Sequence, residues 1–108
     1  MSDLSVRDEL RAFVNERDWA QFHTPENLAK SISIEAAELL EHFQWDASAS
    51  ESEQELIEEL ADVLTYAYLL ADRLGVDPEQ IMLEKLEKTK SKYPTERSRG
   101  RSTKYDRL

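Results

Sequence analysis

Two pairs of acidic residues share one spacing in this chain of 108 residues. Glu35 and Glu38 form the first pair, and Glu59 and Asp62 form the second. Side chains three residues apart on a helix project from nearly the same side, so two helices can bring four carboxylates together. Ionised carboxylates held close repel one another, and a proton or a bound cation relieves that repulsion. The spacing therefore predicts a metal site built from oxygen ligands.

Oxygen ligands favour hard cations over zinc. Octahedral Mg²⁺ suits a site in which the phosphates of a substrate complete the coordination, and Mn²⁺ accepts the same ligands. The chain contains no cysteine, so a thiolate site is excluded. A carboxylate-bridged di-iron site would require Glu-x-x-His on its helices, whereas His42 lies four residues after Glu38. We interpret His42 as a surface or hinge histidine.

A simpler explanation is that these acids only solvate the exposed faces of two amphipathic helices. Three of them interrupt stretches that are otherwise apolar: Glu35 in SISIEAAELL, and Glu59 and Asp62 in EELADVLTYAYLL. An unpaired charge is costly to bury, so this placement favours a cation as partner. The acids alone leave both interpretations open.

Aromatic residues accompany the acids. Tyr66 lies four residues after Asp62 and shares its helix face. Trp45 follows the first acidic pair and offers a flat surface on which a nucleobase can stack. His23 or Gln21 could form hydrogen bonds with the edge of that base. These residues could form an aromatic binding pocket, with Tyr66 one turn from the metal.

Core packing is the alternative explanation for the aromatic side chains. We prefer it for Phe22 and Phe43, and we prefer the pocket for Trp19, Trp45 and Tyr66. Both explanations agree with helical spacing, and they differ only in what the rings contact.

Charge is distributed unevenly along the chain, whose formal net charge is −9. Between Glu35 and Asp62 there are ten acids and neither lysine nor arginine, whereas from Glu84 onward nine bases face four acids. An acidic middle could hold cations, and a basic end could contact an anion; solubility is the simpler alternative. The acidic body would repel DNA, so a nucleic-acid partner is not expected.

Helical periodicity accounts for most of the chain, because apolar residues recur at helical spacing and no stretch alternates long enough for a strand. Four helices are predicted, over about 3–18, 25–42, 52–74 and 78–93. Thr24 and Asp77, each followed by proline, and Ser52 with Glu55 supply start signals. Gly75 supplies a stop signal.

The third predicted helix is apolar around much of its circumference, and a single neighbouring layer could not cover it. We therefore expect an all-α, four-helix bundle-like protomer that oligomerises through its helices as a homodimer or homotetramer. Residues 1–93 would form one domain, and residues 94–108 a basic, partly disordered tail. No membrane span, secretory signal or cysteine is present, so a cytoplasmic location is expected.

The two acidic pairs resemble the metal-binding motif of the all-α nucleoside triphosphate pyrophosphohydrolases, the MazG-like superfamily. The stretches RDWAQFHTPENL, EAAELLEHFQW and EELADVLTYAYLLADRLGVD resemble its dCTP pyrophosphatase branch. The resemblance extends from about residue 13 to residue 93. One departure is Leu10, where mammalian members of the branch carry a histidine that reaches the substrate. This departure weakens the inference that the substrate contains deoxycytidine, but it does not affect the inferred reaction.

The resemblance implies a function for each group of residues. The metal ligands would be Glu35, Glu38, Glu59 and Asp62, binding Mg²⁺ or Mn²⁺. The nucleoside pocket would comprise Trp19, Ala20, Gln21, Phe22, His23, Trp45 and Tyr66. Glu38 is the first candidate for the general base and Glu41 the second. Apart from the resemblance, the candidates for binding the β and γ phosphates are basic residues of the final third, with Lys88 and Lys92 put forward among Lys85, Lys88, Lys92, Arg97, Arg99 and Lys104.

The implied reaction is hydrolysis of a nucleoside triphosphate between its α and β phosphates, giving a monophosphate and pyrophosphate. The expected substrates are dCTP or modified deoxycytidine triphosphates, removed to sanitise the nucleotide pool. The alternative is a non-catalytic helical assembly module that binds divalent cations. That module would depend on cations for stability and would release no pyrophosphate.

Overall fold

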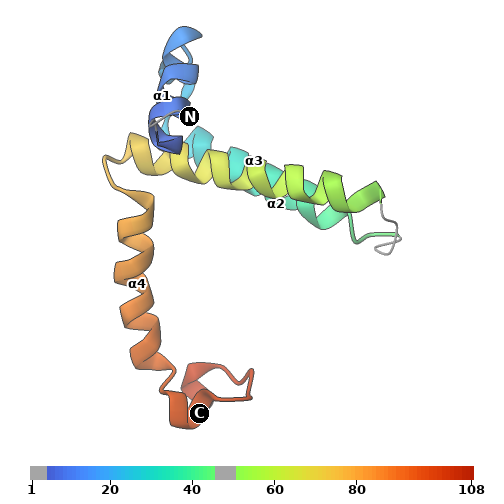
Figure 1. The fold of residues 1–108 in the computed structure, drawn as a ribbon, viewed down its shortest axis with the longest axis vertical. Helices are drawn as coiled ribbons and strands as arrows, with labels where there is room; N and C mark the ends of the chain where they lie inside the picture. Colours follow the sequence, from blue (N-terminus) through green and yellow to red (C-terminus); the bar gives the residue numbers. More distant parts are fainter. Residues whose placement is uncertain (1–4, 46–50) are drawn as a thin grey trace. The chain divides into compact units, whose positions relative to one another are not determined.

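A computed structural model describes residues 5–45 and 51–108 of the chain, and all regular structure in these residues is helical (Figure 1). The α-helices are α1 (Val6–Glu16), α2 (Pro25–Glu41), α3 (Glu51–Arg73), α4 (Pro78–Lys92) and α5 (Thr95–Ser98). Two 3₁₀ turns, η1 (Ala20–Phe22) and η2 (Tyr105–Arg107), complete the elements. The all-α prediction is confirmed, and each of the four predicted helices is present with slightly different ends.

Side-chain caps fix where three of the helices begin. The hydroxyl oxygens of Ser5 and Thr24 accept hydrogen bonds from the third backbone amide after them, at 3.2 and 3.1 Å. Oδ1 of Asp77 accepts from the amides of the second and third residues after it, at 2.9 and 3.2 Å. The helix α3 begins at Glu51, and the side chain of the predicted cap Ser52 lies outside the described part of the chain.

The end of α3 is a glycine-dependent turn. Gly75 adopts a φ of 72°, the left-handed conformation that side chains other than glycine tolerate poorly. Its amide donates to the carbonyl of Asp72 at 3.1 Å, and the amide of Val76 donates to the carbonyl of Ala71 at 3.0 Å. This pair of bonds is the Schellman arrangement, and it satisfies carbonyls that the helix end would otherwise leave free.

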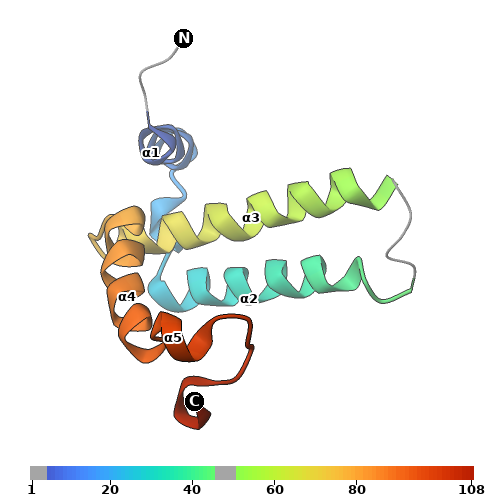
Figure 2. The ribbon, with the colours of Figure 1, turned by 60° about the horizontal axis from the view of Figure 1, so that its bottom comes forward.

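The chain divides into two compact units, Met1–Val76 and Asp77–Leu108. In the first unit α2 and α3 run side by side along most of their length (Figures 1 and 2). The helix α1 contacts α3, where the guanidinium of Arg11 reaches Asp72 at 2.6 Å. These contacts fix the relative positions of the two acidic helices and of α1.

Little of the first unit is fully buried. Val14, Leu28 and Ala71 are the buried apolar residues among the described residues of this unit. Several large apolar side chains of α2 and α3 are about half exposed or more: Ile34, Leu40, Ile57 and Leu64. A single copy of the chain therefore leaves a large apolar area in water.

The second unit joins α4 to the C-terminal residues. The ring of Tyr105 packs edge-on against Tyr93, with 6.1 Å between centroids, and the Lys92 ammonium lies 4.7 Å from the centre of the Tyr105 ring. The predicted boundary at residue 93 and the partial disorder of residues 94–108 stay predictions.

No helix in the described ranges combines the length and the apolar character needed to span a membrane. The cytoplasmic location stays a prediction.

Candidate metal centre and nucleotide pocket

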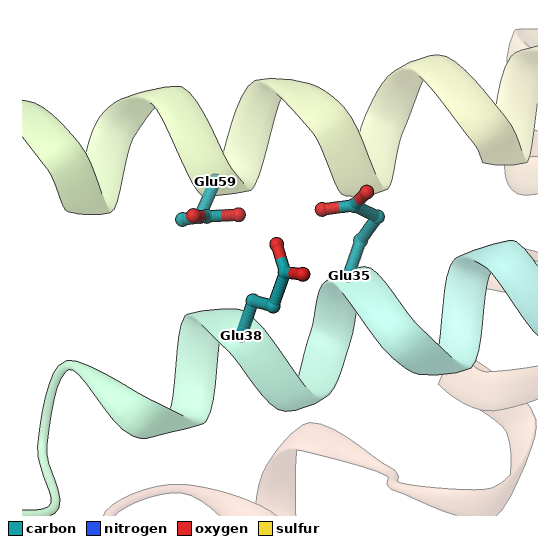
Figure 3. A group of neighbouring side chains, drawn as sticks. All are labelled: Glu35, Glu38 and Glu59. Carbon is teal, nitrogen blue, oxygen red and sulfur yellow. The ribbon is translucent and has the colours of Figure 1, made fainter.

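Three carboxylates converge between α2 and α3. Glu35 and Glu38 extend from α2 toward α3, and Glu59 extends from α3 toward α2 (Figure 3). One carboxylate oxygen of each lies within 4.8 Å of those of the other two, and all three residues are partly buried. The antiparallel packing of the two helices thus joins acids that are far apart in the sequence. We call Glu35, Glu38 and Glu59 the carboxylate trio.

The trio is electrostatically strained. Burial, with a hydrogen bond and repulsion from Glu38, raises the pKa of Glu35 from its ordinary value near 4.5 to about 7. The charges of Asp62 and Glu59 act in the same direction. Burial and Glu38 also raise the pKa of Glu59, and His42 opposes part of that rise. Glu35 and Glu59 therefore retain their protons more firmly than a free carboxyl does, and a bound cation could reverse this effect.

The trio has the donor atoms that a divalent cation requires. Oε2 of Glu35 and Oε2 of Glu59 are buried and accept no hydrogen bond. A buried carboxylate oxygen without a partner is destabilising, and a hard cation is the partner that suits several such oxygens at once. The residues present therefore fit a divalent metal ion.

Asp62, the fourth predicted ligand, occupies a different position. It lies on α3 one turn after Glu59, is more exposed than the trio, and does not belong to that group of converging oxygens. Its charge still contributes to the raised pKa of Glu35 and Glu59, so it lies near them. It also lines the adjacent pocket, which places it between the two parts of the predicted site. Its role as a ligand stays a prediction.

An apolar pocket of about 350 Å³ opens beside Asp62, enclosed by α1, α3 and the link between α1 and α2. Its lining includes three residues of the predicted nucleoside site, Trp19, His23 and Tyr66. Trp19 packs edge-on against Phe13, with 5.5 Å between ring centroids. The size and the apolar walls suit a nucleobase or nucleoside.

The other predicted pocket residues have different surroundings. Ala20 lines a separate cavity of about 100 Å³, which His23 shares. The amide of Gln21 donates to the carbonyl and carboxylate oxygens of Asp18, at 3.0 and 3.2 Å, so it closes the turn after α1. Phe22 is 60% exposed, contrary to the core packing preferred for it.

Four further residues that the sequence singled out lie outside the pocket lining. Trp45 is 88% exposed just after α2, so in a single chain it stacks on nothing that would shield it. Phe43, preferred as a core residue, is 55% exposed, and that preference is wrong for the single chain. Lys88 and Lys92 belong to α4 in the second unit, and their contact with phosphate stays a prediction.

Sequence reasoning missed four pocket residues and misread one histidine. Phe13, Val14, Thr65 and Leu69 line the apolar pocket, as does Leu10, which the sequence had marked as a departure from the family pattern. Thr65 lies three residues after Asp62, so the spacing that singled out Tyr66 could have identified it as well. The surface interpretation of His42 is wrong, because its side chain is only 14% exposed and faces Glu59.

Comparison with known proteins identifies the family of this chain. The sequence pattern of the MazG-like family matches residues 30–108, a range that contains all four predicted metal ligands. The chain belongs to the MazG-like family. The predicted resemblance is thereby confirmed, and the exposed apolar helices and the carboxylate trio are features of a MazG-like chain.

Relatives of this MazG-like chain are named pyrophosphatases. It is 40% identical over 104 residues to dCTP pyrophosphatase 1 of Rattus norvegicus and 39% identical to that of Homo sapiens. Each alignment covers 89% of this chain and 61% of the relative, so the chain spans less than two thirds of their length. The crystal structure of a pyrophosphatase from Archaeoglobus fulgidus has a TM-score of 0.69 and 46% identity, covering 81% of this chain and 87% of the other.

Proposed function

We propose that this MazG-like protein hydrolyses nucleoside triphosphates to a monophosphate and pyrophosphate with the help of Mg²⁺. The observation that carries the proposal is the carboxylate trio, with two buried oxygens that lack partners, beside an apolar pocket of nucleoside size. Asp62 lines that pocket and acts electrostatically on the trio. The names of the relatives support the same reaction.

The trio would supply the metal ligands, with Asp62 as the fourth. When bound, Mg²⁺ neutralises charge on the phosphates and lowers the pKa of a water molecule that attacks in line. Glu38 belongs to the trio, and Glu41 lines an open pocket with Glu38 and Glu59. Either carboxylate would accept the proton of the attacking water, with Glu38 the first candidate. Mn²⁺ would occupy the same ligands.

The apolar pocket would hold the nucleoside. Trp19 and Tyr66 offer rings against which a base can stack, and His23 offers a hydrogen bond to its edge. Leu10 lines this pocket, so the departure from the dCTP pyrophosphatase branch lies where the nucleoside would bind. We propose dCTP or a modified deoxycytidine triphosphate as the substrate, in keeping with the names of the relatives.

Self-association completes the proposal. The exposed apolar side chains of α2 and α3 would be covered by a second copy of the chain, in a homodimer or homotetramer. In such an assembly Trp45, exposed in one copy, could contact the nucleoside. Lys88 and Lys92 remain the candidates for the β and γ phosphates.

A non-catalytic helical assembly module that binds divalent cations is the second candidate function. The trio favours this module as strongly as it favours the enzyme, because the module requires a bound cation and no substrate. The apolar pocket beside Asp62 favours the enzyme, since binding a cation does not require a nucleoside-sized cavity.

Pyrophosphate release from a panel of canonical and modified nucleoside triphosphates, with Mg²⁺ and with EDTA, separates the two candidates. The enzyme releases pyrophosphate and the matching monophosphate only with the metal, fastest from deoxycytidine nucleotides. Glu59→Gln should abolish turnover with the helical content intact, whereas Glu26→Gln, on the exposed start of α2, should leave it unchanged. No release from any nucleotide, with Mg²⁺ still raising the Tm, would establish the assembly module instead.

A further inference from the structure

The imidazole of His42 occupies a position that none of the roles above uses. His42 follows the last residue of α2 as its C-cap, and its amide donates to the carbonyls of that helix's last turn. The side chain is 14% exposed, and Nε2 lies 4.0 Å from Oε1 of Glu59 on α3. The histidine therefore turns inward, across the gap between the two acidic helices.

Carboxylates surround the imidazole on its open side. An open pocket of about 360 Å³ is lined by His42 together with Glu38, Glu41 and Glu59. Between Glu35 and Asp62 the sequence has neither lysine nor arginine, so His42 is the only basic side chain of this stretch. Among the residues that line this open pocket, His42 is therefore the one with a side-chain nitrogen.

The two oxygens of Glu59 have different surroundings. Oε1 is the oxygen closest to the imidazole, and Oε2 is buried without a hydrogen bond. A carboxylate held at one oxygen can direct the other at a cation without losing side-chain entropy when the ion arrives. The separation of 4.0 Å is longer than a hydrogen bond, so the two side chains must approach each other for one to form.

We propose that His42 is a positioning residue of the metal centre, whose Nε2–H holds Oε1 of Glu59 so that Oε2 faces the cation. The inference rests on the metal centre of the proposed function and assigns a role to a residue outside the four predicted ligands. Hydrogen bonds to metal-binding carboxylates commonly change metal affinity about 10- to 100-fold when they are removed.

Binding of Mn²⁺ to the substrate-free, full-length chain tests the proposal, with free Mn²⁺ measured by its EPR signal. His42→Leu removes the donor and should raise the Kd for Mn²⁺ about tenfold or more. His42→Gln keeps an N–H donor of similar reach and should restore most of the affinity. His42→Asn keeps a donor that is too short to reach Glu59, and it should bind as weakly as the leucine variant.

The matched control is Gln54→Leu, which removes an amide that donates to Glu58 at 3.4 Å on the exposed side of α3. It should leave the Kd for Mn²⁺ unchanged, because that pair lies outside the trio. Circular dichroism in EDTA should show the same helical content in every variant. If His42 had only a structural role, its replacement would lower the Tm in EDTA, and His42→Gln would not restore the affinity for Mn²⁺.

Three results would overturn the proposal. In the first, His42→Leu binds Mn²⁺ as tightly as the wild type does. In the second, His42→Leu and His42→Gln weaken the binding of Mn²⁺ equally. Pulsed EPR could also show an imidazole nitrogen bound directly to Mn²⁺, which would make His42 a ligand. If the wild type and Glu59→Gln both fail to bind Mn²⁺, the metal centre of the proposed function is refuted as well. If Glu59→Gln fails to bind Mn²⁺ while His42→Leu binds it like the wild type, the metal centre stands and the role of His42 is refuted.

Discussion

Four acidic residues with one spacing have different roles at the scale of single side chains. Glu35 and Glu59 each have a buried oxygen without a partner, and both have a raised pKa. Glu38 raises the pKa of both, and Asp62 lines the pocket that adjoins them. The folded chain therefore holds its acids at an electrostatic cost, which a cation or a proton would relieve.

Without metal, the chain should lose stability as the pH rises. The pKa of Glu35 is about 7 in the folded chain, against an ordinary value near 4.5. Because the folded state then binds more protons than the unfolded state, the free energy of unfolding falls between about pH 4.5 and pH 7. Glu59, whose pKa is also raised, adds to the same trend.

Urea unfolding of wild type and Glu35→Gln in EDTA, across pH 5 to 8, measures this dependence. Glutamine carries no proton to lose, so the variant should gain stability over the wild type as the pH rises, and saturating Mg²⁺ should reverse that order. Ser33→Ala, an exposed neighbour on α2 that does not titrate, should differ from the wild type by the same amount at each pH. A pH-independent gain for Glu35→Gln would contradict the raised pKa.

At the scale of elements, local signals fix where the helices begin and end. Thr24 and Asp77 cap α2 and α4 through their side-chain oxygens, and Gly75 ends α3. These boundaries matter for the site, because the register of α2 against α3 decides which acids meet. The helix α3 begins at Glu51, before the predicted start signal at Ser52, since helix ends without a proline are defined by sequence only to within one or two residues.

Gly75→Ala should destabilise the chain by about 1 kcal/mol. The backbone at Gly75 has a φ of 72°, a conformation that is energetically unfavourable for alanine. An added Cβ would meet no atom within 4 Å, so the loss would come from the backbone and not from a clash. Gly75→Asn should lose less, since asparagine tolerates the left-handed region. Equal urea midpoints for glycine and alanine would show that the turn relaxes into another conformation.

At the scale of the whole molecule, exposed apolar surface is the dominant feature of the single chain. Leu40 is 70% exposed and lines a shallow cavity of about 340 Å³ with Phe43. Leu64 on α3 is 51% exposed. Surfaces of this kind on small proteins are commonly interfaces, and the proposed homodimer or homotetramer would remove them from water.

Light scattering after size exclusion tests that assembly. The wild type should have the mass of two or four chains, each of 12.6 kDa. Leu40→Asp places a charge in the apolar surface and should shift the mass toward one chain, with lower turnover if sites are shared. Glu9→Lys, a charge reversal at an exposed polar position of α1, should keep the wild-type mass. A wild type with the mass of one chain would contradict the proposed assembly.

The sequence by itself determined the all-α class, the four long helices and the pairing of acids on their faces. Local physics suffices for these features, because capping, helical periodicity and the spacing of three residues act within one element. The motif around Glu35 and Glu59 also indicated the MazG-like family, which the match to residues 30–108 confirms.

Only the tertiary structure decided which side chains meet. Spacing puts Glu59 and Asp62 on one side of α3, but the packing of α2 against α3 brings Glu59 into the trio and leaves Asp62 at the pocket. The same packing turns His42 inward, and it leaves Trp45 exposed. The physical reason is that a helix face spans many side chains, and only the angle and offset of two packed helices select the few that touch.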